Sequence, residues 1–389
     1  MASQQRVIDM VKTLSMRHEI HFMSFVKNKK DKTLTTEKMK AICENYLPIE
    51  PINYNSSKIG RKVIGFKAII SYLLIGKSFR EYYIGHKKII KQIKNVIESE
   101  DFSIIQIEYW YLYRIFKNLK NGITKVIDSH GILSDKKKLE YEKLHNGKVP
   151  FFRERELNNY KLNEINAIKA CDLFISISNI DDIFIKASFP KKESLLVHTG
   201  QNLDMYRDYS LKNSQPTILF YGGMDSNQNL YAVIRFINNI LPIVKLKIPD
   251  VKCRILGKNP PNEIKKLHNG KNFIVEGFVP DVRKPISKSS VMILPLELGA
   301  GFRSRIVEVL SLGVPVVGTH NALDNTGLID GEHCYISDDD EVMANYLYDI
   351  MTNQEMRETM SKKCKKFVMK NFSLENTFGK LSSYYSNLK

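Results

Sequence analysis

The segment "LPLELGAGFRSRIVEVLSLGVPVV", from Leu294 to Val317, places glycines and charged side chains between two apolar runs. The residues from Val291 to Leu296 are apolar and typical of a buried strand, and a helix is expected to begin near Phe302. Gly313 and the apolar run from Pro315 to Thr319 follow and predict a further strand. A strand, a glycine-containing loop, a helix and a second strand form the repeating unit of a parallel α/β sheet.

The loop and the start of this helix carry residues suited to a diphosphate. Gly299 and Gly301 allow backbone N–H groups to converge where the helix begins, and Arg303 and Arg305 add fixed positive charge. Glu308 lies three residues after Arg305, on the same helix face, where its carboxylate can accept hydrogen bonds from a ribose diol. The two glycines could instead simply form a turn before the helix. Arg305 and Glu308 could form an exposed i,i+3 salt bridge. Their combination at the end of a late strand favours a nucleotide site.

The second half of the chain alternates between strand-like and helix-like segments. Each strand-like run is short, rich in β-branched or aromatic residues, and ends at glycine, proline or a polar residue. The runs are Thr217–Gly223, Val251–Gly257, Asn272–Val279, Val291–Leu296, Pro315–Thr319 and Cys334–Ser337. A helical pattern from Asn229 to Lys247 lies between the first two. Strict alternation predicts a parallel sheet covered by helices on both faces.

The first half repeats this architecture less regularly. A helix is expected from Ser3 to His18 and a second one from Arg153 to Cys171. The strand-like runs are Glu19–Val26, Ser103–Trp110, Lys125–Gly131 and Leu173–Ser178. The residues from Leu195 to Pro216 have the composition of a linker between two domains.

Composition narrows the class of protein. At 389 residues with 43% hydrophobic content, the chain is long enough for two ordinary cores. Its five scattered cysteines form no CxxC pair, which predicts neither a disulfide framework nor a zinc site and favours a cytoplasmic location. The most apolar stretch, Val63 to Ile75, is interrupted by Lys67 and is shorter than the ~20 residues of a membrane-spanning helix. No signal peptide is visible at Met1.

The net charge of +17 comes mostly from the residues up to Ser214. A basic surface attracts polyanions, either nucleic acid or an anionic membrane leaflet, and a lysine-rich proteome gives the same bias. Charge alone, without a recognised fold or stacking platform, is weak support for nucleic-acid binding, and we expect none. The segments Val63–Tyr83 and Lys362–Phe372 combine apolar and basic residues. They are compatible with peripheral contact with an anionic membrane and with ordinary amphipathic packing.

These motifs together resemble those of glycosyltransferase family 4, whose members are retaining enzymes of the GT-B fold. The resemblance covers nearly the entire second half. It rests on "ILFYGGMDSNQNLYAVIRFINNILP", "GFVPDVRKPISKSSVMILP", "PLELGAGFRSRIVEVLSLGVPVV" and "FVMKNFSLENTFGKLSSYY". In the first half the resemblance is weaker and rests on "SQQRVIDMVKTLSMRHEI", "VIDSHG" and "CDLFISIS".

The resemblance implies an α/β protein of the GT-B type, with two Rossmann-like, doubly wound domains facing a cleft. The expected domains are an acceptor-side domain at residues 1–212, a donor-binding domain at 213–370, and a C-terminal helix at 371–389 that packs back on the first domain. Members of the family begin with a strand and a glycine-rich loop ahead of the helix that resembles Ser3–His18. The first domain of this chain is therefore expected to lack that strand, through truncation or degeneracy.

The resemblance also assigns roles in binding the donor. Glu308 corresponds to the glutamate that holds the donor ribose, and Arg305 stands where the family usually has a basic ligand of the diphosphate. The loop from Gly299 through Ala300, Gly301 and Phe302 to Arg303 would contact the donor phosphates and sugar. Phe278 and Val279 would lie along the base. Gly222 and Gly223 match the glycine-rich turn after the first strand of the donor domain, or simply form a turn between strand and helix.

Two departures from the family pattern bear on catalysis. The first glutamate of the family's E-x7-E pattern falls at Ala300, as in a subset of the family. The basic residues that often follow the first donor-domain strand are missing from "GGMDSNQN". Arg303 and Arg305 are therefore expected to carry most of the charge that stabilises the leaving group.

The expected chemistry needs no metal and no cofactor beyond the nucleotide-diphosphate sugar, because GT-B enzymes typically work without a metal ion. The acidic cluster from Asp338 to Glu341 is expected to cap a helix rather than bind a metal. His130 follows a strand, and the resemblance implies contact with the transferred sugar, oriented by Asp128 or Ser129. A lone histidine is also often structural. The expected catalytic residues are His130, Arg305 and Glu308.

We therefore expect a cytoplasmic, hexosyltransferase-type enzyme, peripheral at the inner face of the cell membrane. It would transfer a sugar to a glycan or lipid-linked acceptor in the biosynthesis of a surface polysaccharide such as lipopolysaccharide or capsule. Ala300 and the absent strand also fit a catalytically degenerate protein of the same fold, which binds nucleotide sugars or acts as a scaffold.

Overall fold

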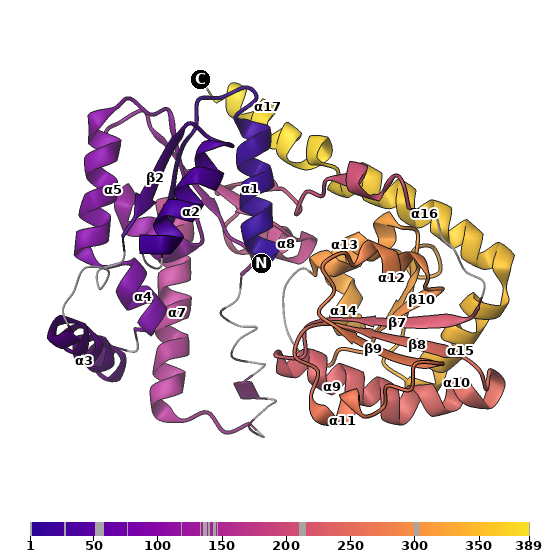
Figure 1. The fold of residues 1–389 in the computed structure, drawn as a ribbon. Coiled ribbons are helices and arrows are strands. Elements are labelled where there is room, and N and C mark those ends of the chain that lie inside the picture. The colour runs from indigo at the N-terminus through magenta and orange to yellow at the C-terminus, as the bar shows by residue number, and fades with distance from the viewer. Residues whose placement is uncertain are drawn as a thin grey trace. The chain divides into compact units, whose positions relative to one another are not determined.

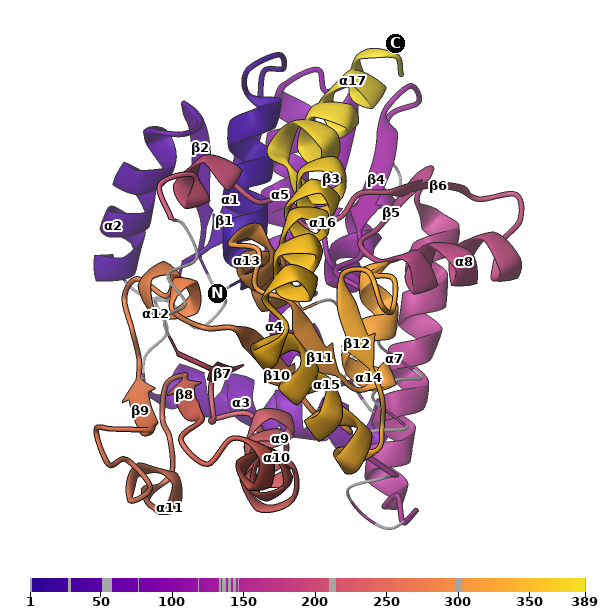
Figure 2. The ribbon, with the colours of Figure 1, turned by 90° about the vertical axis from the view of Figure 1, so that its right-hand side faces the viewer.

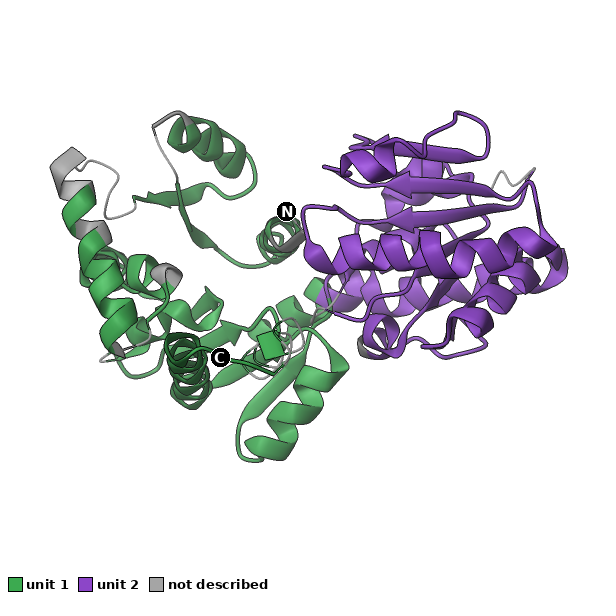
Figure 3. Ribbon diagram, turned by 90° about the horizontal axis from the view of Figure 1, so that it is seen from below, with its two compact units in different colours: residues 1–198, 378–389 green, residues 199–377 purple. Residues whose placement is uncertain are grey.

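The computed structural model describes residues 2–26, 29–50, 58–75, 77–117, 119–132, 134, 138, 141–142, 145, 147–209, 215–298 and 303–388. The chain forms two compact units, shown in Figure 3. Unit 1 comprises Met1–His198 and Phe378–Lys389, and unit 2 comprises Thr199–Thr377. The domain limits expected from the sequence do not coincide with these units, since unit 2 begins before residue 213 and ends after residue 370.

Unit 2 is built on one parallel sheet of six strands in the order β12-β11-β10-β7-β8-β9. Each of the six runs predicted in this half forms a strand, shortened by one or two residues at its ends. The strands are β7 (Thr217–Tyr221), β8 (Lys252–Leu256), β9 (Phe273–Gly277), β10 (Val291–Leu294), β11 (Val316–Gly318) and β12 (Cys334–Ile336). Every residue of β10 is buried, as expected of a strand covered on both faces.

Helices cover both faces of this sheet (Figure 1). The first group is α9 (Asn227–Arg235), α10 (Leu241–Lys247) and α11 (Asn262–Lys265); the opposite face carries α12 (Arg283–Ser287), α13 (Ser304–Ser311) and α14 (His320–Leu323). Two further helices, α15 (Asp340–Thr352) and α16 (Gln354–Phe372), pack against α10 and α13 respectively. The helix expected from Asn229 to Lys247 is interrupted by a π-helical turn at Phe236–Ile240. The strand order reverses between β10 and β7, where ligands bind in doubly wound sheets.

Unit 1 divides its described strands between two parallel sheets (Figure 2). One sheet pairs β1 (His21–Phe25) with β2 (Asn45–Ile49). The other has the order β3-β4-β5-β6, with β3 at Ile104–Glu108, β4 at Thr124–Asp128, β5 at Leu173–Ser176 and β6 at Glu193–Leu196. The sequence analysis missed β2, and it also missed β6, which overlaps the segment assigned to a linker.

The helices of unit 1 surround these sheets. They are α1 (Ala2–Leu14), α2 (Lys29–Lys40), α3 (Lys58–Ile75), α4 (Phe79–Ile84), α5 (Lys87–Ser99), the 3₁₀ helix η1 (Trp110–Phe116), α7 (Phe151–Ala170), α8 (Asn179–Ser188) and α17 (Lys380–Ser386). Helix α17 packs against α1. The ring Nε2 of His18, just after α1, lies 3.0 Å from the carbonyl oxygen of Ser382 in α17. The last residues of the chain therefore belong to the core of unit 1.

A buried ion pair joins the first helix of unit 1 to its central strand β4. The Arg6 Nη2 atom donates to the Asp128 Oδ2 atom at 2.7 Å, and Nη1 donates to the carbonyl oxygen of His198 at 2.8 Å. The side chains of Arg6 and Asp128 are 1% and 0% exposed. Two charges at this depth are stable only as a pair.

Replacing Arg6 by methionine is expected to lower the free energy of unfolding by about 3–5 kcal/mol, since Asp128 would remain buried without its counter-ion. Urea denaturation measures this loss. Arg17→Met, at an exposed arginine that bonds Ser383, is the control and should change stability by less than about 0.5 kcal/mol. Equal losses for the two variants would contradict the importance of the buried pair.

Candidate functional site

In unit 2, backbone hydrogen bonds of glycine residues link the carboxyl ends of the three neighbouring strands β7, β8 and β9. The Gly222 N–H donates to the carbonyl oxygen of Leu256 at 2.9 Å, and the Gly257 N–H donates to that of Gly277 at 2.8 Å. Gly257 has a φ of +145°, and a Cβ atom there would lie 1.9 Å from the Gly222 carbonyl oxygen. Only glycine fits at position 257, which therefore sets the backbone path at the carboxyl edge of the sheet.

Arg305 lies directly in front of Gly222. A Cβ atom on Gly222 would lie 2.3 Å from Nη1 of Arg305, so the glycine makes room for the guanidinium. Nη2 donates to Oδ1 of Asn229 at 2.8 Å, and Nε is buried without a hydrogen-bond partner. Burial, followed by the charge of Arg303, lowers the pKa of Arg305 to about 10. Within the described residues no carboxylate forms an ion pair with it, and the buried Glu308 acts on its charge without contacting it.

Glu308 lies one helical turn after Arg305 and has a different partner. The Tyr221 hydroxyl, at the end of β7, donates to Oε2 of Glu308 at 3.0 Å. Burial raises the pKa of Glu308, and burial together with the Glu308 charge raises the pKa of Tyr221. The two described side chains of Arg305 and Glu308 form no salt bridge, so that interpretation of their spacing is wrong.

A basic side chain reaches the glycine loop from the strand next to β7. Lys258 follows Gly257, and its Cγ atom would lie 3.4 Å from a Cβ atom on Gly223. Its Nζ atom pairs with Oδ2 of Asp225 at 2.9 Å, and both side chains are largely exposed. Lys258 was not predicted from the sequence, because the resemblance places the basic residue after β7 rather than after β8. The available signal was the lysine directly after the glycine that ends β8.

The structure places the other predicted donor residues as follows. Phe278 is 72% exposed and follows Gly277, whose carbonyl bonds Gly257, while Val279 packs partly against the core. Arg303 immediately precedes α13, and its Nη1 donates to the carbonyl oxygen of Asn321 at 3.4 Å. The structure thus brings Gly222, Gly223, Arg305 and Glu308 together. The predicted residues Gly299, Ala300, Gly301 and Phe302 lie outside the described residues.

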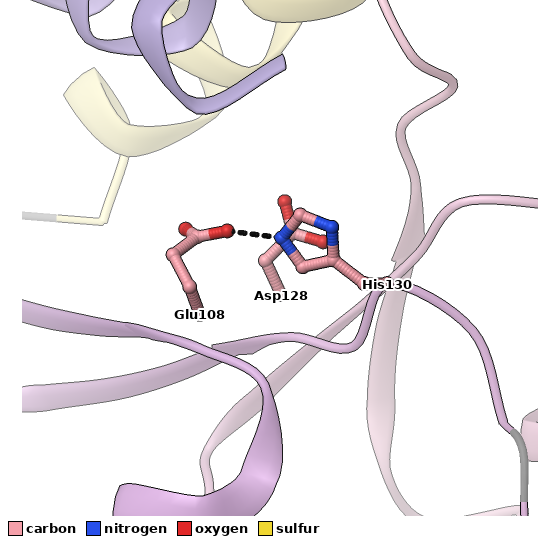
Figure 4. A group of neighbouring side chains, drawn as sticks. All are labelled: Glu108, Asp128 and His130. Atoms are coloured by element: carbon pink, nitrogen blue, oxygen red, sulfur yellow. Dashed lines mark hydrogen bonds and ion pairs between the residues drawn. The ribbon is translucent and has the colours of Figure 1, made fainter. Parts of the chain in front are cut away.

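In unit 1, the residues predicted around His130 form a polar cluster at the ends of β3 and β4 (Figure 4). His130 has a φ of +52°, an uncommon conformation for a residue other than glycine. Its Nε2 atom lies 2.5 Å from Oε2 of Glu108, and its ring stacks on Tyr109 at 4.2 Å between centroids. Asp128 is beside it but faces Arg6, so the residue that orients the imidazole is Glu108, which the sequence analysis missed.

The charges of this cluster favour a protonated imidazole. Burial lowers the pKa of His130, but the negative charges of Asp128 and Glu108 outweigh it, and the pKa is raised above its ordinary value. Burial, followed by the charge of Asp128, raises the pKa of Glu108. Cationic His130 can donate hydrogen bonds through both ring nitrogens.

Glu108, Asp128 and His130 also form the one group of three metal-ligating side chains within the described residues, with atoms within 4.8 Å of one another. The guanidinium of Arg6 already sits on Asp128 at 2.7 Å, and a second cation would be repelled there. The cluster is thus better suited to holding a proton than a divalent metal. At the acidic cluster 338–341, Asp339 accepts the Val342 N–H at 2.9 Å and caps α15, which confirms the predicted cap.

Known proteins resemble this chain in part of its sequence and in its fold. Residues 215–353, most of unit 2, match the family described as Glycosyl transferases group 1. An uncharacterized 44.6 kDa protein in the cps region of Klebsiella pneumoniae is 21% identical over 390 residues, covering 94% of this chain and 91% of that protein.

Several solved structures share the whole fold at low sequence identity. Anabaena HepE in complex with UDP has a TM-score of 0.67 at 13% identity, covering 99% of this chain and 96% of that one. Sucrose-phosphate synthase from Thermosynechococcus elongatus has a TM-score of 0.67 at 14% identity, covering 99% and 93%. A glycosyltransferase from Rickettsia africae has a TM-score of 0.63 at 16% identity, covering 99% and 94%. The chain therefore has the GT-B fold with two Rossmann-like units, as predicted.

Among the described residues, no helix combines the length and the apolar character needed to cross a membrane.

His130 is expected to titrate above its ordinary pKa of about 6.5. Because the folded-state pKa is the higher one, its stabilising contribution is complete below about pH 6.5 and is lost as pH rises through the folded-state pKa. Histidine NMR titration of the full chain measures this pKa. Glu108→Gln should lower it toward the ordinary value, and a pKa that is unchanged in the variant would contradict the pairing.

Gly257→Ala is expected to lower the free energy of unfolding by about 3 kcal/mol, because its Cβ would collide with the Gly222 carbonyl. Gly331→Ala is the matched control: it has a φ of +73° but no atom within 4 Å of the added Cβ, so it should cost only about 1–2 kcal/mol. Chemical denaturation compares the two, and equal losses would mean that the backbone contact does not matter.

Proposed function

We propose that this chain is a retaining glycosyltransferase that moves a sugar from a nucleoside-diphosphate sugar to a glycan or lipid-linked acceptor. One observation carries the proposal. Among the described residues, Arg305 is a buried cation that forms no ion pair, and it lies against Gly222, whose lack of a side chain makes room for the guanidinium. A diphosphate supplies the anion that this position lacks, and Glu308 one turn later suits the attached ribose.

Arg305 would stabilise the leaving nucleoside diphosphate. Even with its pKa lowered to about 10, the guanidinium is charged at neutral pH. Its burial means that it acts in a low-dielectric environment, where its interaction with developing negative charge is strong. Asn229 fixes its orientation before the donor arrives. Lys258, which lies near Gly223 and pairs with Asp225, would supply a second cation on leaving that pair, so that the chain's own residues would serve the leaving group without a metal ion.

Glu308 would bind the ribose hydroxyls as a carboxylate acceptor. Tyr221 donates to one carboxylate oxygen and thereby holds the side chain in place. Because burial raises the pKa of Glu308, donor binding should weaken as pH falls through that raised pKa. Phe278, exposed beside the glycine loops, offers an aromatic face to the base.

His130 would contact the transferred sugar from unit 1. Its ring is held by Glu108 and stacked on Tyr109, and in the protonated form the second ring nitrogen would present an N–H group in a fixed direction. A donor of this kind suits a sugar hydroxyl or the charge that develops as the glycosidic bond breaks.

The comparisons support the substrate class. Anabaena HepE has been crystallised with UDP and glucose and with UDP-glucose. The Klebsiella relative is encoded in a cps region, which favours surface polysaccharide biosynthesis over other pathways. The family match over 215–353 covers Gly222, Arg305 and Glu308, on which the proposed chemistry depends.

Arg305→Met and Glu308→Gln are expected to lower donor turnover by about 100-fold or more, since each removes a group aimed at the reacting diphosphate or its ribose. Hydrolysis or transfer of UDP- and GDP-sugars measures turnover, and calorimetry with UDP and GDP measures binding. Arg254→Met is the control, because Arg254 is a partly buried arginine of the same unit that already pairs with Glu276. It should leave both measurements unchanged.

The same assays distinguish an enzyme from a degenerate relative of this fold. If the wild-type chain binds a nucleoside diphosphate through Arg305 but turns over no donor, it is a nucleotide-sugar-binding or scaffold protein. If Arg305→Met binds UDP and GDP as tightly as the wild type, the proposed donor site is wrong.

A further inference from the structure

Helix α3 of unit 1 turns its apolar face toward solvent. The large apolar side chains at positions 63, 66 and 74 are 47%, 64% and 62% exposed, and three more are exposed between them; the six are Val63, Phe66, Ile69, Ile70, Leu73 and Leu74. At 3.6 residues per turn, these positions fall within an arc of about 140°. Ala68, on the opposite side of the helix, is fully buried. We call the six exposed residues the α3 stripe.

Other helices of the chain with apolar and basic residues are oriented the opposite way. In α5, Ile89, Ile93 and Ile97 are buried while Lys87 and Lys88 are exposed. In α16, Cys364 and Val368 are buried among exposed lysines. Ordinary amphipathic packing therefore describes α16, one of the two segments for which the sequence left a membrane contact open. It does not describe α3.

Helix α7, which packs against α3, also exposes apolar side chains at its start. Helices α3 and α7 pack together, and Nη1 of Arg155 donates to the carbonyl oxygen of Leu73 at 3.3 Å. One turn before Arg155, Phe151 and Phe152 are 68% and 47% exposed. Large apolar side chains gathered on one exposed helix face mark an interaction site more often than scattered ones do.

The segment of chain that contains the stripe is strongly basic, while Glu156 of the neighbouring helix α7 interacts with Tyr72 of α3 and pairs with Arg153. Residues 58–97 contain ten lysines and arginines and a single acidic residue, Glu81. Glu81 is buried and is engaged by Ser78 and Asn159, so it presents no negative charge to solvent. Lys62 and Lys67, on α3 itself, are exposed.

These features fit an anionic membrane surface better than a protein partner. An apolar stripe of Phe, Leu, Ile and Val with lysines beside it is the pattern of a helix that lies in the headgroup region. Helix α3 is 18 residues, about 27 Å long, and can lie flat along a bilayer. Anionic headgroups would attract Lys62 and Lys67 of α3 while the stripe enters the acyl boundary.

We propose that the α3 stripe docks this chain onto an anionic membrane leaflet. The proposal rests on exposure and charge within unit 1 and does not depend on the proposed transferase activity. If both are correct, the docked chain meets a lipid-linked acceptor at the surface where that acceptor resides.

The test is co-sedimentation of the full-length chain with vesicles of phosphatidylcholine alone and of phosphatidylcholine mixed with phosphatidylglycerol. We expect binding to the anionic vesicles, and at least about tenfold weaker binding by the double variant Phe66→Gln/Leu74→Gln. The control is Leu246→Gln/Met369→Gln, at two exposed apolar residues of unit 2, which should bind like the wild type. Circular dichroism and thermal unfolding confirm that both variants fold.

Two further measurements separate the contributions of charge and insertion. Lys62→Glu/Lys67→Glu should weaken binding and reduce its dependence on salt. Phe66→Trp places a fluorophore in the stripe, and its emission should shift to the blue on anionic vesicles and be quenched by brominated lipid. Trp110, the one native tryptophan, is buried and should contribute a constant background.

Several outcomes would overturn the proposal. They are absence of wild-type binding, equal binding to uncharged vesicles, and full binding by the α3 double variant. Sedimentation velocity tests whether a second copy of the chain covers the stripe instead. If the wild type is a dimer and Phe66→Gln/Leu74→Gln is a monomer, a second copy rather than lipid covers the stripe.

Discussion

Unit 2 depends on keeping the guanidinium of Arg305 out of water without pairing it directly with a carboxylate. Arg305 is buried, its pKa is lowered, and its direct partner is the neutral amide of Asn229. That arrangement costs free energy in the empty protein, and the surrounding residues are arranged to accommodate it. Gly222 leaves the space, Gly257 sets the backbone path beside it, and Tyr221 holds Glu308 away from a salt bridge. A site built this way is preorganised for an anion, because the guanidinium has already lost its water when the chain folds and need not be desolvated again when the anion binds.

Unit 1 handles buried charge in the opposite manner. Asp128 is paired with Arg6, and His130, when protonated, is paired with Glu108, so each of these charges has a counter-ion within the cluster. Buried charges that are paired with counter-ions hold their side chains in a fixed geometry and need no ligand to balance them. The cluster therefore suits a role in orienting one proton toward a neutral group such as a sugar hydroxyl. Each unit thus handles buried charge in its own way, with a cation outside ion-pair distance of any described carboxylate in unit 2 and with paired charges in unit 1.

Apolar surface in this chain is distributed as unevenly as charge. The sheet of unit 2 is covered on both faces, and β10 is buried throughout. Helix α3, by contrast, exposes the side of its surface that would be buried in an ordinary amphipathic helix. A fold that can bury Ile89, Ile93 and Ile97 on α5 has no general difficulty in covering apolar residues. The exposed stripe is therefore a local property of α3 and its neighbour α7, next to a strongly basic stretch of chain.

The sequence by itself determined the parallel architecture of unit 2 and the presence of Arg305 and Glu308 near one loop, because alternating strand and helix patterns are local signals. It also located His130 at the end of β4. Contacts between residues far apart in the chain were decided only by the tertiary structure. Glu108 rather than Asp128 holds His130, Lys258 reaches the loop of a neighbouring strand, and Gly257 is constrained by the Gly222 carbonyl. Whether an apolar helix face is covered, as in α16, or left open, as in α3, is equally a tertiary property. Periodicity shows that a helix has two faces, but only packing decides which of them meets solvent.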